Sequence, residues 1–167
     1  DRGLFPSLEA RCYLNHAAVS APPSPVVKAV EQSLARYAGR GLGALPDELA
    51  SRAALRDCLA ELLGVQAEDL GFVSGTSAGL RAVALGFPWR SGDGVVLFEG
   101  DFPANTTPWQ QAAERFGLRV SWLSAGRFMG DPAPGLADLD RVLAEGQALV
   151  AVSAVQFQTG LRMPIEA

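Results

Sequence analysis

The turn Gly75-Thr76-Ser77 combines residue types that bind a phosphate group. An apolar run, residues 70–74, precedes the turn and a helical pattern follows it. Free backbone N–H groups and two hydroxyls would therefore meet at the positive end of a helix dipole, which favours an anion. The alternative is that Thr76 or Ser77 only caps its own helix. The turn has neither the lysine of a Walker loop nor the spaced glycines of a dinucleotide fingerprint.

An aromatic side chain, Phe102, follows the next strand pattern, residues 95–98. The proline after it, Pro103, would restrict the backbone there. At the carboxyl edge of a parallel sheet, the ring could lie flat against a planar ligand. The alternative is a phenylalanine of the core or of a turn.

The amide of Gln156 and the hydroxyl of Thr159 follow a third strand pattern, residues 149–153. They could bind the same ligand, or they could only satisfy the turn that holds them. Together, three strand ends would supply a phosphate site, an aromatic plate and hydrogen-bonding groups. The ligand that fits this set is a flat, phosphorylated heterocycle, which points to pyridoxal 5′-phosphate (PLP).

Strand and helix patterns must alternate along the chain to bring these residues together. The strand patterns cover residues 70–74, 95–98, 118–123 and 149–153. The helical patterns between them cover residues 76–86, 105–116 and 136–145. This order predicts an α/β fold with a parallel sheet covered on both faces, and ligands of such sheets bind at the carboxyl ends of the strands.

Two more helical patterns, residues 24–39 and 47–63, precede the first strand pattern. The segment between them, residues 39–46, is rich in glycine and predicts a flexible connector. We expect residues 1–20 to form an N-terminal arm and residues 21–167 to form one domain.

Composition excludes several classes of partner. The net charge is −4 without any basic run, so neither nucleic acid nor an anionic membrane surface would be attracted.

No apolar run approaches the roughly 20 residues of a membrane span, and no secretory leader opens the sequence, so we expect a cytoplasmic protein. Cys12 and Cys58 have no partner at metal-ligand spacing; we expect no metal site and place both cysteines in the core.

Several segments, taken in order, resemble the amino-terminal part of the class V aminotransferase family. They are Tyr13-Leu14-Asn15-His16-Ala17-Ala18, Gly75-Thr76-Ser77, Gly92-Asp93, residues 99–105 with Trp109, and residues 156–160 with Pro164-Ile165. This is the fold-type I group of PLP-dependent enzymes, which contains cysteine desulfurases, isopenicillin N epimerase-like proteins and kynureninases. The resemblance implies a three-layer parallel-sheet large domain, of which this sequence is the amino-terminal part, and a homodimer that acts on an amino acid.

The resemblance also implies which residues bind the cofactor. They are Gly75, Thr76, Ser77, Phe102, Asn105, Gln156 and Thr159. The first three would hold the phosphate, and Phe102 would stack on the pyridine ring. Asn105 stands where kynureninases place an aspartate near the cofactor, while Gln156 and Thr159 would approach the ring oxygen.

Asn15 and His16 resemble the family's arm that reaches the substrate. A histidine that only stabilises a turn is an equal alternative for His16. Desulfurases usually have a histidine in place of Phe102, so the phenylalanine favours the epimerase-like and kynureninase branches.

Two groups that the family's chemistry requires have no counterpart in this sequence. They are the aspartate that pairs with the pyridine nitrogen and the Schiff-base lysine. Lys28, the single lysine, belongs to the first helical pattern, and neither Asp93 nor Asp101 matches the missing aspartate. We therefore expect a fragment of an enzyme, inactive by itself and with weak or no PLP binding, and we assign it no catalytic residue.

Other functions stay open at this point. The complete enzyme could carry out transamination, sulfur removal, epimerisation or a β-lyase reaction. The chain could also be a stand-alone domain that binds a phosphorylated small molecule without catalysis, or a structural protein derived from the enzyme fold.

Overall fold

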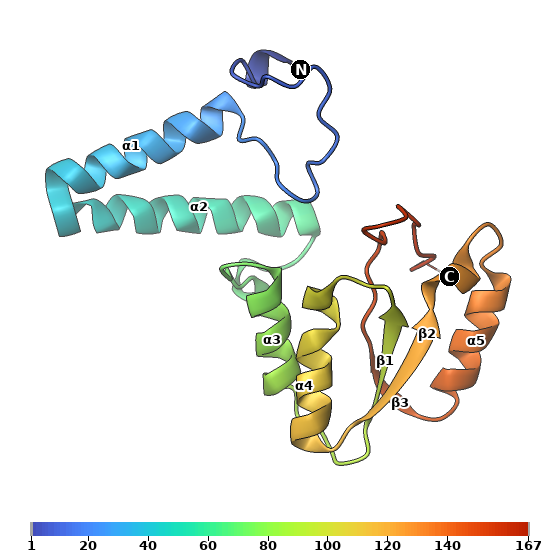
Figure 1. The fold of residues 1–167 in the computed structure, drawn as a ribbon. Coiled ribbons are helices and arrows are strands. Elements are labelled where there is room, and N and C mark those ends of the chain that lie inside the picture. Colours follow the sequence, from blue (N-terminus) through green and yellow to red (C-terminus); the bar gives the residue numbers. More distant parts are fainter. Residues whose placement is uncertain (1, 167) are drawn as a thin grey trace. The chain divides into compact units, whose positions relative to one another are not determined.

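The structure is a computed structural model that describes residues 2–166 (Figure 1). The chain divides into two compact units, Asp1–Gly71 and Phe72–Ala167, and each is described by itself. Within the described residues, no helix has both the length and the apolar character needed to cross a membrane.

A helical hairpin dominates the first unit. Helix α1 (Ser24–Arg40) has Pro25 in its first turn, where the missing N–H costs nothing, and helix α2 (Leu45–Leu63) ends at Gly64 in the left-handed conformation. The glycine-rich segment between them is a 3-10 turn, Gly41–Ala44, rather than the flexible connector we expected. The Arg40 guanidinium fixes this turn because it donates to the Gly43 carbonyl and pairs with Asp47, both at 2.6 Å.

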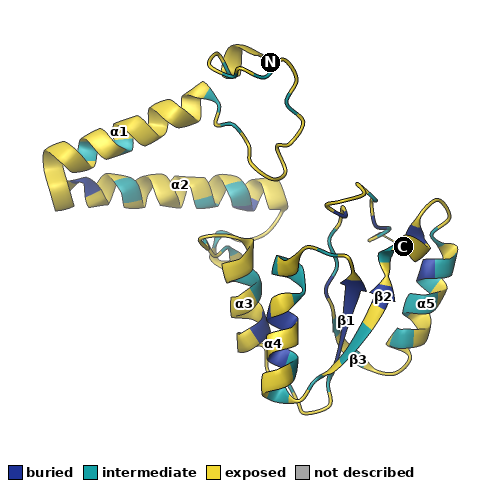
Figure 2. Cartoon of the chain, in the orientation of Figure 1, coloured by how far each residue is buried: buried dark blue, intermediate teal, exposed yellow. Residues whose placement is uncertain are grey.

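The predicted burial of both cysteines is wrong. Cys12 and Cys58 are exposed and free. The two hairpin helices bury little: α1 has no buried residue and α2 buries only Ala60, and Figure 2 shows both helices largely in the colour of exposed residues. Cys58 in α2 is therefore exposed rather than part of a core within this unit.

A parallel sheet forms the centre of the second unit. Its strands are β1 (Gly94–Glu99), β2 (Arg119–Ser124) and β3 (Gln147–Val150), in the order β2-β1-β3. Both neighbours pair with β1 in parallel. The helices of this unit are α3 (Thr76–Gly86), α4 (Thr107–Phe116) and α5 (Ala133–Leu143). The structure confirms the predicted α/β class with a parallel sheet.

Side chains of β1 alternate between two apolar clusters. Val95 and Leu97 pack with α3 and α4, whereas Val96 and Phe98 pack on the face that α5 covers. Buried members of the first cluster are Ala84, Val95, Leu97, Trp109, Ala112 and Ala151. Buried members of the second are Val96, Phe98, Leu123, Phe128 and Met163. Three layers result, with the sheet between the helices (Figure 1).

The predicted strand at residues 70–74 is wrong. This segment belongs to no strand of the structure. Both sides of β1 are already occupied by β2 and β3. Val73 lies instead against the first turns of α3, so close that a Cβ on Gly79 would be 3.3 Å from its Cγ2 atom. Val73 therefore contacts a helix rather than a neighbouring strand.

Candidate functional site

The turn before α3 presents free donors at the start of a helix. Gly75 is the N-cap residue, and Thr76 and Ser77 are the first two residues of the helix, all three exposed. No side chain caps the helix, so neither hydroxyl is used as the capping alternative requires. The first N–H groups of any α-helix have no partner within it. An anion at this turn would therefore meet backbone and hydroxyl donors with positive helix-dipole charge behind them.

Phe102 follows β1 and its ring is half exposed, with 51% of its surface accessible. This exposure excludes the alternative of a core phenylalanine. The ring meets that of Phe157 edge to face, with centroids 5.2 Å apart and planes at 83°. Such a contact holds the ring in place by one edge. The orientation of Phe102 is thus set by a residue from the loop after β3.

Gln156 is buried, and its side-chain amide joins two loops. The amide nitrogen donates to the Gly100 carbonyl at 2.6 Å. The amide oxygen accepts from the backbone N–H of Gln158 and of Thr159 and from the Thr159 hydroxyl, at 2.7–3.0 Å. Both predicted residues of this loop therefore shape the edge of the sheet through bonds to the protein itself.

Asn105 is tied to the same edge through Asp101. Its amide nitrogen donates to the Asp101 carboxylate at 2.8 Å, and its backbone N–H donates to the Phe102 carbonyl at 2.8 Å. The Asp101 carboxylate also accepts from the hydroxyl of Ser153 at 2.6 Å. Sequence reasoning missed Ser153 and Phe157. Their positions were the only signal in the sequence: Ser153 ends the strand pattern 149–153, and Phe157 lies in the loop that follows it.

The predicted residues of the second unit converge on one edge of the sheet. Helix α3 contacts the 3-10 turn Pro103–Asn105 (η4), which follows Phe102. In Figure 1, the start of α3 and the arrowhead of β1 lie at the same end of this unit. Carboxyl ends of parallel strands are where α/β sheets bind ligands.

Asn15 and His16 belong to the first unit. The Nδ1 atom of His16 lies 3.1 Å from the Ser20 hydroxyl, and the ring packs edge-on against Tyr13 at 5.0 Å. The Asn15 carbonyl accepts from two backbone N–H groups of the same turn. These contacts hold His16 within its own turn in the first unit.

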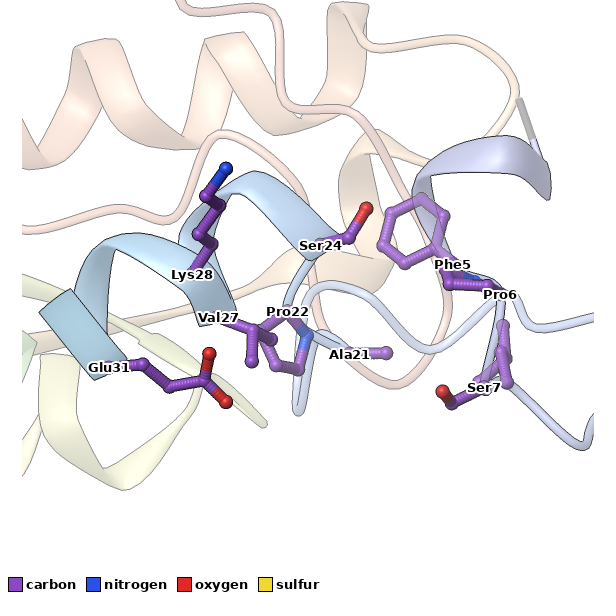
Figure 3. Close-up of a pocket in the computed structure, with 10 residues that line it drawn as sticks. Phe5, Pro6, Ser7, Ala21, Pro22, Ser24, Val27, Lys28 and Glu31 are labelled. Carbon is purple, nitrogen blue, oxygen red and sulfur yellow. The ribbon is translucent and has the colours of Figure 1, made fainter.

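A cavity of about 640 Å³ lies between the N-terminal segment and α1 in the first unit (Figure 3). Its apolar wall includes Phe5, Pro22 and Val27, and Lys28 and Glu31 stand at its border. The lining contains none of the predicted cofactor or substrate residues. No group of three or more potential metal ligands occurs within residues 2–166.

The residues of the second unit fit PLP in part. The unused hydroxyls of Thr76 and Ser77 suit a phosphate, and the half-exposed ring of Phe102 suits a planar heterocycle. The oxygen of the Gln156 amide is already engaged with three donors. Gln156 therefore contributes to the site by holding the surrounding loop in position.

Comparisons with known proteins identify relatives of this chain. A cysteine desulfurase of Enterobacter sp. (strain 638) is 33% identical over 92% of the chain and 39% of that protein. A probable cysteine desulfurase of Pyrococcus abyssi is 27% identical over 97% of the chain and 41% of that protein. The chain thus spans about two fifths of the length of these relatives. They are desulfurases, not members of the epimerase-like or kynureninase branches that Phe102 favours.

Solved structures show the same fold. A C-DES mutant with glycine covalently linked to its PLP cofactor superposes with a TM-score of 0.87 at 25% identity, over 98% of this chain and 43% of that one. Cysteine desulfurase from Thermococcus onnurineus NA1 superposes with a TM-score of 0.75 at 27% identity, over 92% and 39%. The family "Aminotransferase class-V" matches residues 12–167. The chain therefore belongs to the class V aminotransferase family.

Proposed function

We propose that this chain is the PLP-binding part of an enzyme that acts on a sulfur-containing amino acid such as cysteine. The observation that carries the proposal is the pairing of unused donors at the start of α3 with the half-exposed ring of Phe102. The cysteine desulfurase relatives support the substrate class. PLP, when bound, supplies an electron sink for the carbon next to the substrate's amino group.

The residues of this chain would bind and orient the cofactor. Thr76 and Ser77 would donate to the phosphate, and the helix dipole of α3 would stabilise its charge. Phe102, held by Phe157, would cover one face of the ring. Lys28, the single lysine, is an exposed residue of α1, and we assign it no role at the ring and expect no turnover by the chain alone.

We also propose that the functional protein is a homodimer that contacts its partner through α1. Apolar residues recur on this helix at intervals of three and four and remain exposed. They are Val27, Val30, Leu34 and Tyr37. A stripe of this spacing occupies one face of a helix and favours packing against another apolar surface.

Equilibrium dialysis of PLP against this chain tests the cofactor site. We expect the double variant Thr76→Ala/Ser77→Ala to weaken binding about 10- to 100-fold, since it removes two hydrogen bonds to a charged phosphate. Ser51→Ala is the matched control, because its hydroxyl bonds to the Asp47 carbonyl in α2. Unchanged affinity in the double variant would refute the site.

Pyridoxal without phosphate and simple phosphate monoesters extend this experiment. We expect both to bind more weakly than PLP, since each lacks one of the two contacts. If phosphate monoesters bind as tightly as PLP, the turn is a general phosphate site, as expected of a stand-alone binding domain. We also expect that reduction with borohydride leaves no covalent PLP adduct on Lys28. An adduct there would show that Lys28 does contact the cofactor.

A further inference from the structure

We propose that Asp101 is a positioning residue, whose carboxylate sets where Phe102 and Asn105 lie relative to the loop after β3. The inference rests on the proposed function, because these two residues face a cofactor only if PLP binds at this edge. Asp101 itself would touch neither cofactor nor substrate.

The carboxylate of Asp101 accepts four hydrogen bonds from three other residues. Its Oδ1 atom accepts from the backbone N–H of Phe102 at 2.7 Å and from the hydroxyl of Ser153 at 2.6 Å. Its Oδ2 atom accepts from the side-chain amide of Asn105 at 2.8 Å and from the backbone N–H of Ser153 at 3.2 Å. One side chain thus joins the loop after β1 to a residue 52 positions further along the chain.

These four bonds use the full accepting capacity of a carboxylate, which has about four lone-pair sites. The small cavity that borders Asp101, Ser153 and Gln156 has a volume of about 10 Å³, about the room that one water needs. The carboxylate therefore has neither a free acceptor position nor space beside it for a ligand. It can act on the site only through the groups that it holds.

The loop that Asp101 holds begins at a glycine in a conformation that other residues rarely adopt. Gly100, directly before it, has a φ of 75°, in the left-handed region that glycine adopts without strain. Phe102, directly after it, is half exposed, and Phe157 contacts its ring at one edge only. Bonds between charged and neutral groups are stronger than bonds between neutral groups. The carboxylate therefore fixes the backbone at Phe102, whereas the edge contact with Phe157 orients the ring.

The variant Asp101→Asn tests this role without changing the size of the side chain. An amide group has one accepting oxygen, and its nitrogen would face a backbone N–H, that of Phe102 or of Ser153, which it cannot satisfy. We expect the backbone amides of Phe102 and Ser153 to exchange with deuterium at least about tenfold faster than in the unmodified protein. We also expect PLP to bind about tenfold or more weakly.

Asp93→Asn is the matched control. The Asp93 carboxylate also accepts a backbone N–H, that of Arg90 at 2.7 Å, but it lies before β1, at the opposite end of the strand. We expect this variant to leave both the exchange of the Phe102 amide and the affinity for PLP unchanged. Ser153→Ala, which removes one of the four donors and keeps the backbone N–H, should give an intermediate loss.

The two measurements separate this inference from the proposed function. If Asp101→Asn leaves amide exchange at Phe102 and Ser153 unchanged, the positioning role is wrong, whether or not PLP binds. If exchange rises but PLP affinity stays the same, Asp101 orders the loop without serving the cofactor, and the inference is also wrong. If the unmodified chain shows no PLP binding at any concentration, the proposed cofactor site fails, whereas amide exchange in Asp101→Asn still tests the positioning role by itself.

Discussion

The side-chain nitrogen of Gln156 donates a 2.6 Å hydrogen bond to the carbonyl oxygen of Gly100, across 56 positions of the chain. Gln156 is 6% exposed, so this bond is shielded from water. The same amide holds the turn that follows it through its oxygen atom. One buried side chain therefore connects the ends of two neighbouring strands.

Replacement of Gln156 by alanine should destabilise the second unit. The change removes the hydrogen bonds to the Gly100 carbonyl and to the donors at Gln158 and Thr159, and each such bond contributes about 0.5–1.5 kcal/mol. We expect the free energy of unfolding to fall by about 2–4 kcal/mol in urea titrations followed by circular dichroism. Gln158→Ala, at an exposed position, is the control and should change it by less than about 0.5 kcal/mol. Equal effects of both changes would contradict the role of Gln156.

Phe102→Leu should lower the affinity for PLP with little effect on stability. The leucine keeps apolar surface but loses the aromatic face, and an aromatic contact contributes about 0.5–1.5 kcal/mol beyond its area, or about three- to tenfold in binding. Phe87→Leu is the control, because Phe87 follows the opposite end of α3 from the phosphate turn. Equilibrium dialysis measures both, and equal affinities would refute the stacking role.

Local patterns predicted the elements better than the contacts between them. Helix α3 was expected at residues 76–86 and occupies Thr76–Gly86, because its start signal and apolar spacing lie within one short segment. The segment 70–74 has the composition of a strand but belongs to no strand, because pairing with a neighbour is not determined by local composition.

The site shows the same limit. The turn at Gly75 and the exposed ring of Phe102 could be located from residues that are adjacent in sequence. The role of Ser153 could not, because its partner Asp101 is 52 positions away and no local spacing connects them. The sequence also suggested free polar groups on Gln156, whereas burial engages the oxygen of its amide.

Glu48→Gln should weaken the helical hairpin in a pH-dependent manner. The Arg36 guanidinium, at 2.5 Å, and the Ser33 hydroxyl hold the pKa of Glu48 below its ordinary value of 4.5. The charged form is thus favoured by folding, so its contribution is complete above about pH 4.5 and is lost as the pH falls through the lowered pKa. We expect the difference in urea midpoint between the two proteins to be largest near neutral pH and to vanish in acid.

The control for this prediction is Asp57→Asn, a carboxylate of the same helix, α2, without an ion pair among residues 2–166. Its urea midpoint should stay close to that of the unmodified chain from neutral pH to pH 3. A difference between Glu48→Gln and the unmodified chain that grew on acidification would contradict the assignment.

Gly135→Ala should destabilise the second unit although alanine favours helices. A Cβ at Gly135 in α5 would lie 2.6 Å from the ring of Phe128, which is buried in the second apolar cluster. Such overpacking costs about 1–3 kcal/mol. Gly86→Ala in α3 meets no atom within 4 Å and should be neutral or slightly stabilising. Thermal unfolding compares the two variants. Equal melting temperatures would contradict the prediction and show that the Phe128 ring can move to make room for the added methyl group.

Val30→Asp and Leu34→Asp should reduce self-association of the chain. Each places a charge in the middle of the exposed apolar stripe on α1, where burial of an unpaired carboxylate is unfavourable. Light scattering should show an increased monomer fraction for both, whereas Gln32→Asp on the same helix should behave as the unmodified chain. A chain that is already monomeric at high concentration would argue against the proposed dimer contact.

The bonds across 52 and 56 positions also bear on the order in which the second unit acquires its structure. Strand β2 follows β1 after one helix, so these two can pair as soon as the chain through Ser124 is present. The Asp101–Ser153 and Gln156–Gly100 bonds must wait until β3 has docked beside β1. Contacts of long sequence separation form late because loop closure has an entropic cost. During synthesis, the carboxyl edge of this sheet would therefore be the last part to form its native contacts.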